Sequence, residues 1–395
     1  MKPKVLHVVN SFLPLTQKWL EILLVNLNRE SNIFAKYRNS KSTDQFNLNE
    51  FSKSSWVKEN LQKPSLLSRL KVKALSLKFS FAKEVDAYAR INDYDILHTH
   101  FADIACEFLD IEINPDLSYI CSFYGWDYEM LPYTRKDYVA KYQKLFKKID
   151  CIITEGPHGK KVLIDKGCDP DKIKVIPLGI ELGQLRNSKI KSENSLRLIQ
   201  IASFREKKGQ LDTVKAVRKL IEEGCDIKLT FIGDNGDQSY YDSVMSEIKL
   251  YKLMEHIVVR DFIDYDKIEE ELTNHDVFLQ PSRYASNMDC EGGAPTTLFH
   301  ALNVGLPIVA TDHCDIPFVV INNQTGKIVK EKDIDALAKA LKLFYNMGDT
   351  EYSTYSKNAI DDVRSRFDIT KNAKELESLY SLFINNNANS ISTNL

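Results

Sequence analysis

The sequence predicts an α/β protein made of two doubly wound, Rossmann-like domains. Short apolar runs rich in β-branched residues alternate with longer stretches of helical period along the whole chain. Strands that alternate with helices imply right-handed crossovers and open parallel sheets. The chain has 395 residues, more than one hydrophobic core usually supports. The alternation pauses at one polar segment, 183–195, which separates two halves of similar size.

The expected strands are short and nearly continuous in apolar character, which is typical of strands that a parallel sheet buries on both faces. They are expected at 5–9, 95–98, 119–123, 151–154, 174–177, 198–202, 228–232, 257–259, 276–280 and 307–311. Apolar residues at helical spacing predict amphipathic helices between them, for example from Trp19 to Leu27, from Val214 to Ile221 and from Ile334 to Phe344.

The domain boundaries follow from the same pattern. The first domain is expected at 1–182 and the second at 196–370, with 183–195 as the linker between them. The last periodic segment predicts a helix at 371–384. The polar tail at 385–395 is expected to be disordered, because terminal segments without apolar anchors are seldom ordered.

Composition excludes several classes of protein. The 43% of hydrophobic and 27% of charged residues are typical of a folded globular chain, which excludes intrinsic disorder. The net charge of −2 gives no reason to expect a nucleic-acid partner. No apolar run approaches the ~20 residues of a membrane-spanning helix, and the first residues do not resemble a signal peptide. Seven cysteines without zinc-type spacing indicate reduced thiols, so we expect a cytoplasmic protein without a metal.

Charge is concentrated in one segment of the first half. Residues 51–90 carry nine Lys or Arg residues against three acidic ones, with leucines interleaved, and a second basic cluster lies at 135–148. One interpretation is a patch that rests on anionic lipid headgroups at the inner face of the cell membrane. The alternative is a solvated helix face, which is what most charge runs are.

The residues that could carry chemistry follow the expected strands of the second half. Dinucleotide-binding, Walker A and zinc-protease signatures are absent from the sequence. Open α/β sheets bind ligands at the carboxyl ends of their strands. In the first such loop Arg205 and Lys208 stand between a strand and a helix, where cations and backbone N–H groups can bind a diphosphate. The alternative is exposed surface charge, in which case Lys208 contributes little to folding.

A second loop contains Gly233 and Asp234 after the next expected strand. Glycine there permits the backbone to approach a flat ligand, or it simply permits a tight turn. The sequence does not decide between the two.

A third loop contains Glu291 and two glycines ahead of Pro295, a residue that suits the first turn of a helix. A carboxylate and backbone amides in such a place could hold hydroxyl groups and a developing negative charge together. The alternative for Glu291 is a helix-capping carboxylate. The alternative for His300, further along that helix, is a histidine satisfied within the core.

In this order, the three loops resemble the nucleotide-sugar half of a GT-B glycosyltransferase of the retaining GT4 family. The run E-G-G-A-P…A-x-x-x-G-L-P-I-V-A-T-D-H-x-D-I-P, from Glu291 to Pro317, is similar to enzymes of bacterial exopolysaccharide, colanic-acid-like and O-antigen assembly. In the first half, 98–101, 122–127 and 155–158 are similar to acceptor-side motifs of that subgroup. The C-terminal helix resembles the GT-B helix that crosses back onto the first domain.

The resemblance implies roles for individual residues. The implied catalytic residues are Arg205, Lys208 and Glu291. The implied donor-binding residues are Ser203, Gly233, Asp234, Gly292, Gly293, Ala294, Pro295, Thr296 and His300. The implied acceptor-side residues are His100, Tyr124, Asp127, Glu155 and His158. The resemblance implies neither a metal nor a cofactor.

The sequence departs from the family pattern at three positions. The family's E-x7-E pair ends in a glutamate that binds ribose hydroxyls, whereas here His300 stands in its place, nine residues after Glu291. Ala202 and Ser203 replace a frequent Gly-Arg pair, so Arg205 must supply that cation. Tyr124 occupies the position of a frequent histidine.

The implied function is a retaining, metal-independent glycosyltransferase. It would move a hexose from a nucleoside diphosphate sugar, with UDP as the expected nucleotide, to a hydroxyl of a growing, lipid-linked bacterial surface polysaccharide. Two alternatives remain open. One is a nucleotide-sugar-binding scaffold subunit of a transferase complex, which the replacement at His300 would suit. The other is a GT-B sugar-nucleotide epimerase, which needs no acceptor.

Overall fold

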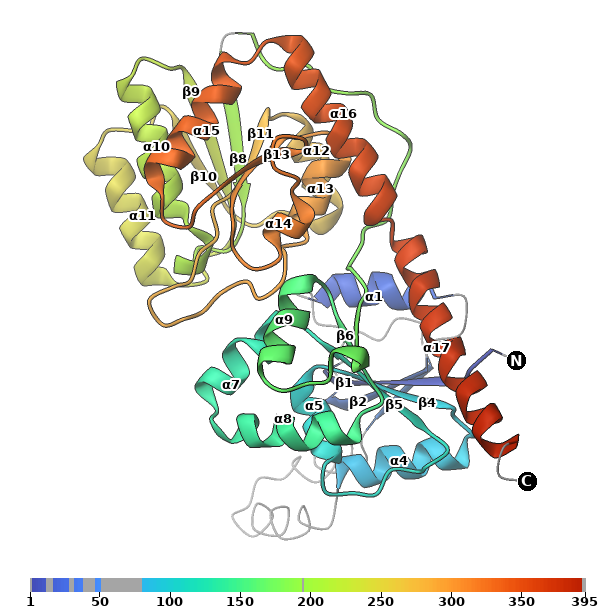
Figure 1. Ribbon diagram of the computed structural model, residues 1–395. Coiled ribbons are helices and arrows are strands. Elements are labelled where there is room, and N and C mark those ends of the chain that lie inside the picture. The colour runs from blue at the N-terminus through green and yellow to red at the C-terminus, as the bar shows by residue number, and fades with distance from the viewer. Residues whose placement is uncertain are drawn as a thin grey trace, which may run out of the picture. The chain divides into compact units, whose positions relative to one another are not determined.

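The computed structural model describes residues 2–11, 17–27, 32–37, 47–50, 80–193 and 195–392 (Figure 1). The chain divides into two compact units. The first comprises Met1–Glu155, Lys160–Leu178 and Ile369–Leu395, and the second comprises Gly156–Gly159 and Gly179–Asp368. Most of the basic segment, 51–79, lies outside the described residues, so the membrane patch stays a prediction.

The first unit is built on a seven-stranded sheet in which all neighbouring strands run parallel. In spatial order the strands are β3 (Asn47–Glu50), β2 (Asn32–Tyr37), β1 (Val5–Ser11), β4 (Ile96–His100), β5 (Ser118–Phe123), β6 (Cys151–Thr154) and β7 (Ile173–Val175). The chain order reverses between β1 and β4, as in a doubly wound sheet. Strands β4, β5 and β6 are buried along their whole length.

The helices of the first unit cover this sheet with their apolar faces (Figure 1). They are α1 (Lys18–Val25), α4 (Phe81–Ile91), α5 (Ala102–Ala105), α6 (Gly125–Tyr128), α7 (Met130–Thr134), α8 (Asp137–Lys148), the part of α9 (Pro157–Asp165) from Lys160 onward, and α17 (Ile369–Ser392). Helix α4 illustrates the local cause: Ser80 accepts the N–H of Lys83 at its start. Phe81, Val85 and Ala89 then recur at helical spacing and are buried.

Helix α17 belongs to the first unit and contacts α1. Nδ2 of Asn372 donates to the carbonyl oxygen of Pro177 at 3.0 Å, and the buried Tyr380 hydroxyl lies 2.6 Å from Nδ1 of His98. The tail expected to be disordered from 385 instead continues this helix as far as Ser392. Neither proline nor glycine interrupts the sequence there, so no residue ends the helix earlier.

The second unit has a six-stranded parallel sheet with the same kind of reversal, here between β8 and β11. Its order is β10 (Ile257–Arg260), β9 (Ile227–Ile232), β8 (Leu196–Ile201), β11 (Val277–Gln280), β12 (Ile308–Thr311) and β13 (Gly326–Val329). Its helices are α10 (Gln210–Glu222), α11 (Gln238–Leu250), α12 (Ile268–Thr273), α13 (Thr297–Asn303), α14 (Ile316–Val319), α15 (Ile334–Asn346) and α16 (Asp349–Arg366). Helices α10, α11 and α15 lie on one side of the sheet, and α12, α13 and α16 on the other (Figure 1).

The predicted α/β class with two doubly wound sheets is confirmed. Three strands were missed, namely β2, β3 and β13, and each lies at or next to the edge of its sheet. Segment 183–195 has neither helix nor strand among its described residues, but it packs within the second unit, where Nζ of Lys189 donates to the carbonyl oxygen of Thr273 at 2.9 Å. In the described part of the chain, no helix is sufficiently long and apolar to span a bilayer.

Candidate active site

The loops after β8 and β11 flank the point where the strand order of the second unit reverses, which is where open α/β sheets bind ligands. The two loops meet at Gly209, whose φ of +71° favours glycine. A Cβ at this position would lie 2.1 Å from the carbonyl oxygen of Pro281. Gly209 therefore lets the turn before α10 lie directly against the loop after β11.

The centre of this region is an ion pair between Lys208 and Glu291. Lys208 ends the short 3-10 turn η4 (Glu206–Lys208), and Glu291 lies in the loop before α13. Nζ of Lys208 lies 2.7 Å from Oε2 of Glu291, and the two side chains are 17% and 7% exposed. The expectation of an exposed Lys208 is wrong, because the lysine folds onto a buried carboxylate.

Polar groups from β11 and its loop hold the Glu291 carboxylate in place. Oγ of Ser282 donates to Oε1 of Glu291 at 2.6 Å, and Nε2 of Gln280 donates to Oγ of Ser282 at 2.7 Å. Burial alone would raise the pKa of Glu291, but the ammonium groups of Lys208 and Lys207 and the hydrogen bonds to the carboxylate lower it. Glu291 is therefore an ionised partner of Lys208 at neutral pH and not a helix cap.

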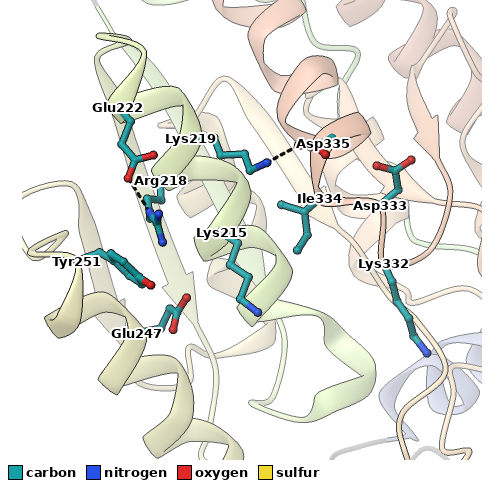
Figure 2. Close-up of a pocket in the computed structure, with 10 residues that line it drawn as sticks. All are labelled: Lys215, Arg218, Lys219, Glu222, Glu247, Tyr251, Lys332, Asp333, Ile334 and Asp335. Atoms are coloured by element: carbon teal, nitrogen blue, oxygen red, sulfur yellow. Dashed lines mark hydrogen bonds and ion pairs between the residues drawn. The ribbon is translucent and has the colours of Figure 1, made fainter.

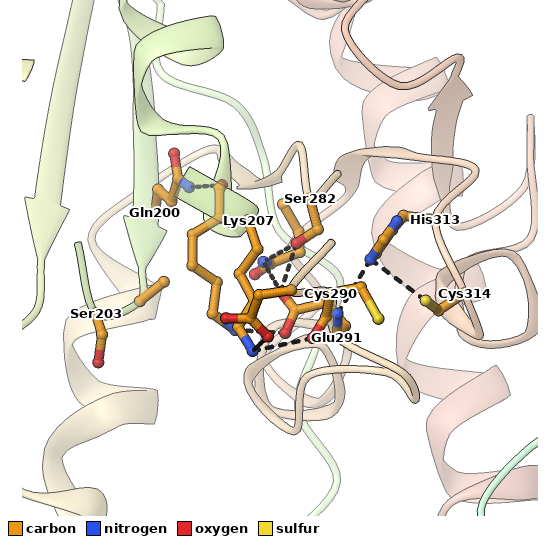
Figure 3. A network of polar contacts seen from close by, with 12 residues as sticks. Gln200, Ser203, Lys207, Ser282, Cys290, Glu291, His313 and Cys314 are labelled. Carbon is orange, nitrogen blue, oxygen red and sulfur yellow. Dashed lines mark hydrogen bonds and ion pairs between the residues drawn. The ribbon is translucent and has the colours of Figure 1, made fainter. Parts of the chain in front are cut away.

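Lys207 reaches the same loop as Lys208. Its Nζ donates to Oδ1 of Asp289 at 3.0 Å and to the carbonyl oxygen of Cys290 at 2.9 Å. The carbonyl oxygen of Lys208 accepts a hydrogen bond from Nε2 of Gln200 at 2.7 Å. Figure 3 shows the contacts of Lys207, which connect the loop that contains Cys290 and Glu291 to the turn after β8. The two lysines therefore concentrate positive charge beside Glu291.

The loops after β8 and β9 pack closely, which explains Gly233. A Cβ there would lie 2.0 Å from the carbonyl oxygen of Ala202. The carbonyl oxygen of Asp234 accepts the N–H of Phe204 at 2.9 Å. Gly233 and the backbone of Asp234 therefore build the wall of the site through backbone contacts.

Arg205 lies between these two loops. A Cβ at Gly236 would lie 2.8 Å from Nε of Arg205 and 3.2 Å from Cβ of Ser203, so glycine leaves room for both side chains. Arg205 is exposed and Ser203 is half-buried. Arg205 thus lies beside the loop after β9, whereas Lys208 points at Glu291.

The glycine-rich segment after Glu291 leads into α13, which begins at Thr297. Gly292 has a φ of +73°, and both Gly292 and Gly293 are buried. The half-buried residues that follow are Ala294, Pro295 and Thr296. Two buried side-chain oxygens, Oγ1 of Thr297 and Oε1 of Gln280, have no hydrogen-bond partner among the described residues. Buried polar atoms normally have one, so these two are suited to a bound ligand.

His300 takes no part in the Lys208–Glu291 network. Its Nδ1 lies 3.1 Å from Oε1 of Glu269 and its Nε2 lies 3.0 Å from the hydroxyl of Tyr265. The residue is 5% exposed. Asn303 also donates to Glu269, at 2.8 Å. His300 therefore has a carboxylate beside it, at the helix position where a carboxylate was expected.

His313, in the loop after β12, supports the backbone of Glu291. Its Nε2 accepts the N–H of Glu291 at 3.1 Å, and its Nδ1 lies 2.6 Å from Oε1 of Glu331. Burial opposes a charged ring, but hydrogen bonds to Cys290 and Glu331 outweigh it and raise the pKa of His313 to about 9. That pKa favours the charged ring at neutral pH, but a proton on Nε2 would break the bond to the Glu291 amide, so the hydrogen bond at 3.1 Å belongs to the neutral, Nδ1-protonated ring.

Two of the expected acceptor-side residues meet at the carboxyl ends of β4 and β5 in the first unit. Nδ1 of His100 lies 2.9 Å from the hydroxyl of Tyr124, and Nε2 of His100 lies 3.1 Å from Nδ1 of His7. Burial lowers the pKa of His100 to about 3, so the ring is neutral. These side chains form a buried chain of neutral hydrogen-bonding groups.

Asp127 and Glu155 lie beside Tyr124 but act on the backbone. Oδ2 of Asp127 accepts the N–H of Tyr124 at 2.9 Å and so caps α6. Burial raises the pKa of Asp127 well above its usual value. Oε1 of Glu155 accepts the N–H of Gly125 at 3.2 Å. Both carboxyl groups thus stabilise the turn that carries Tyr124.

His158 is separate from these residues, because the segment Gly156–Gly159 belongs to the second unit. Its backbone N–H donates to Oδ1 of Asp315 at 2.7 Å. A Cβ at Gly156 would lie 2.2 Å from Cγ of Asp315. The structure therefore places His158 with the loop after β12.

A second charged depression lies between α10, α11 and the start of α15 (Figure 2). Its charges largely neutralise one another: Nε of Arg218 lies 2.7 Å from Oε1 of Glu222, and Lys219 pairs with Asp335. Both members of the Lys219–Asp335 pair are well exposed, at 45% and 70%. This depression lacks the buried carboxylate that marks the site at Glu291.

Sequence reasoning missed several residues that build the site. They are Gln280, Ser282, Thr297, His313 and Glu331. Three of them, Gln280, Ser282 and His313, stand at or within two residues of the end of an expected strand. Their position at the strand ends is the signal that could have found them.

Comparisons with known proteins identify the family and the fold. Residues 183–362 match the family "Glycosyl transferases group 1", and residues 45–184 match "Glycosyltransferase Family 4". The chain is 29% identical over 243 residues to the putative colanic acid biosynthesis glycosyltransferase WcaL of Escherichia coli, an alignment that covers 61% of this chain and 59% of that protein. It is 29% identical over 208 residues to the amylovoran biosynthesis glycosyltransferase AmsK of Erwinia amylovora, covering 52% of this chain and 50% of that protein. The matches thus span half to three fifths of these relatives' length.

Solved structures share the fold over almost the whole chain. A glycosyltransferase from Rickettsia africae superimposes with a TM-score of 0.73 at 16% identity, covering 97% of this chain and 99% of that chain. HepE of Anabaena in complex with UDP and glucose superimposes with a TM-score of 0.73 at 13% identity, covering 96% and 99%. At such identities the likeness concerns the fold alone, and it is the predicted GT-B fold.

Proposed function

The chain belongs to the glycosyltransferases, with a family 4 domain followed by a group 1 domain, and we propose that it transfers a hexose from a UDP-sugar to a glycan hydroxyl. The proposed transfer retains the configuration at the sugar and needs no metal. The proposed acceptor is a growing, lipid-linked bacterial exopolysaccharide. The names of WcaL and AmsK support an exopolysaccharide as the acceptor, and the UDP and glucose bound to HepE support a UDP-hexose as the donor. Retention and independence of a metal rest on the resemblance of the sequence to the GT4 family.

The observation that carries the proposal is the buried Lys208–Glu291 pair at the switch point of the second sheet. A lysine held mostly out of water beside a second lysine favours a dianionic ligand such as a diphosphate. When the diphosphate takes Lys208, the carboxylate of Glu291 becomes available to accept hydrogen bonds from sugar hydroxyls. Binding of the donor would therefore break the ion pair and free Glu291 for the sugar.

In the proposed transfer the site must stabilise a departing diphosphate. The bond between the anomeric carbon and the phosphate oxygen breaks, and the acceptor oxygen bonds to the same face of that carbon. The departing phosphate oxygen takes the acceptor proton, so no protein base is required. Lys208 and Arg205 neutralise the developing charge, a task that a metal ion performs in other transferases. Thr297 and the amides of Gly292 and Gly293 offer further donors.

The first unit supplies the proposed acceptor side. The hydroxyl of Tyr124 hydrogen-bonds to His100, and its backbone N–H donates to Asp127. These contacts fix the position of Tyr124 without a charged group. We propose the membrane patch in the basic segment 51–90, which has nine Lys or Arg residues against three acidic ones. The described helix α4 contributes equal numbers of basic and acidic residues to it. A lipid-linked acceptor would be reached from such a surface.

The test is a panel of nucleotide sugars given to the purified full-length chain, with release of the nucleoside diphosphate as the readout. We expect slow hydrolysis of one UDP-hexose that persists in a metal chelator and falls sharply in Glu291→Ala. Binding of the nucleotide sugar without any turnover would favour the scaffold subunit. Conversion into another UDP-sugar, without release of UDP, would favour the epimerase.

A further inference from the structure

A cluster of metal-ligating side chains lies next to Glu291, outside the pair described above. Cys290 comes from the loop after β11, and His313 and Cys314 come from the loop after β12. Each offers one ligand atom, and the three atoms all lie within 4.8 Å of one another. Figure 3 shows the imidazole of His313 between Cys314 and the backbone of Glu291. These cysteines form no disulfide.

The spacing of the three atoms suits a tetrahedral metal ion. Nε2 of His313 lies 3.3 Å from Sγ of Cys314. Around Zn²⁺, a thiolate sulfur and an imidazole nitrogen on a tetrahedron are about 3.6 Å apart, from bond lengths of about 2.3 and 2.05 Å. Two thiolates at that metal are about 3.8 Å apart by the same geometry. Movements of about 1 Å or less would bring the cluster to this geometry.

The ring of His313 is already oriented as a ligand. Oε1 of Glu331 lies 2.6 Å from its Nδ1, and Oε2 of Glu331 accepts the N–H of Tyr284 at 3.0 Å. A carboxylate on the outer nitrogen is the usual partner of a metal-binding histidine, because it fixes the tautomer and directs the inner nitrogen at the ion. Here it directs Nε2 at the two thiols. His313 is fully buried, Cys290 is 4% exposed and Cys314 is half-buried, so two of the three ligands are sheltered and the third is reached from solvent.

We propose that Cys290, His313 and Cys314 bind a thiophilic metal ion of the zinc class through Sγ, Nε2 and Sγ, with a water in the fourth position. Binding releases the two thiol protons. The metal takes the lone pair on Nε2 that now accepts the Glu291 N–H at 3.1 Å. Loading therefore removes the hydrogen bond that holds the Glu291 backbone, and the metal acts as an inhibitor of the site and not as its cofactor. This last step rests on the proposed function.

Cobalt(II) titration of the reduced full-length protein tests the site directly. We expect one equivalent of Co²⁺ to produce a thiolate-to-cobalt charge-transfer band that Zn²⁺ then removes. Cys290→Ser and Cys314→Ser should each abolish the band, while Cys225→Ser, a buried cysteine elsewhere in the second unit, should keep it. Glu331→Gln should weaken Co²⁺ binding roughly 10- to 100-fold. Thermal melts establish that each variant is folded.

A wild-type protein without the band, or a band that survives both serine substitutions, would overturn the site. Its effect on the enzyme is measured separately, as Zn²⁺ inhibition of UDP-hexose hydrolysis that a chelator reverses. Cys314→Ser should lose this inhibition and retain hydrolysis. Inhibition of equal strength in Cys314→Ser would overturn the coupling to Glu291. A protein with the cobalt band but no hydrolysis of any donor would refute the proposed function and leave the metal site standing.

Discussion

The second unit contains two lysine–carboxylate pairs of the same chemistry in very different surroundings. Lys208 and Glu291 are 17% and 7% exposed, whereas Lys219 and Asp335 are 45% and 70% exposed. Lys219 lies in the last turn of α10. Its pair with Asp335 joins α10 to the neighbouring α15 (Figure 2). Lys208 lies on the turn that precedes α10 and reaches across the switch point of the sheet.

The difference in burial indicates that the two pairs have different roles. An exposed pair has little net effect on stability, because water solvates both charges well and salt screens them. A buried pair gains more attraction but loses the hydration of both charges, so apolar residues would often stabilise the fold as well or better. A buried lysine and glutamate at a ligand-binding edge are therefore better explained by a bound substrate than by folding.

The largest expected effect is on donor turnover. Lys208→Ala and Glu291→Ala should each lower kcat for UDP-hexose hydrolysis roughly 100-fold or more, comparable to the loss of one oxyanion-hole donor. Lys219→Ala and Asp335→Ala, which remove the same side chains from the exposed pair, should stay within about twofold of wild type. Steady-state kinetics of the four variants decide this. Equal losses in the two pairs would show that burial at the strand ends does not mark the reaction site.

The next effect is on stability, where a double-mutant cycle separates the pairs. Lys208→Ala alone leaves Glu291 buried without its cation, so we expect a loss of about 2–4 kcal/mol in the free energy of unfolding. Adding Glu291→Ala should recover part of that loss, with a coupling of about 1–3 kcal/mol. The corresponding cycle for Lys219 and Asp335 should be additive within error. Denaturant unfolding supplies the values, and an additive cycle at 208 and 291 would contradict the buried pair.

The pH dependence of stability is a further way to compare the buried pair with the exposed one. The pKa of Glu291 is lowered in the folded protein, so its stabilising contribution is present above its ordinary value of 4.5 and is lost as the pH falls through the folded pKa. The stability advantage of wild type over Glu291→Gln should therefore be constant from pH 7 to about 5 and shrink below about 4.5. The pKa of Asp335 is also lowered by Lys219, but both side chains are exposed and solvent screens their attraction, so the profile of Asp335→Asn should depart from that of wild type much less. An advantage that grows on acidification would have the wrong sign for this ion pair.

Much of the fold could be predicted, and two of the three missed strands lie at the edges of their sheets. Central strands such as β5 and β6 are buried on both faces and therefore read as continuous apolar runs. Strand β3, N-L-N-E, lies at a sheet edge, and β13 begins with glycine at another edge. Edge strands need less apolar surface, so their sequences do not stand out from loops.

The sequence singled out some residues of the candidate site but not their arrangement. Lys208 and Glu291 were each identified because they follow strands, yet their pairing spans 83 positions and depends on the tight turn at Gly209. The cysteine spacing likewise indicated no metal, because Cys290 lies far from His313 and Cys314 in sequence. Adjacent parallel strands bring the loops after β11 and β12 together, and spacing rules that assume one local loop do not register this.

The smallest effect on turnover is expected at His300. This residue pairs with the carboxylate of Glu269, and the pair can be compared with Lys208–Glu291. Nδ1 of His300 lies 3.1 Å from Oε1 of Glu269, so an imidazole and a carboxylate together stand where the family has one glutamate. We expect His300→Ala to raise the donor KM by up to about tenfold with kcat within about twofold, the pattern of uniform binding. The free energy of unfolding of His300→Ala should fall by about 1–2 kcal/mol, because the half-buried Glu269 loses a donor. Asn303→Ala removes a different donor to Glu269, which also keeps Arg186 as a partner at 3.0 Å, and it serves as the control. A stability loss with an unchanged KM in both variants would make His300 a core histidine and remove it from the donor site.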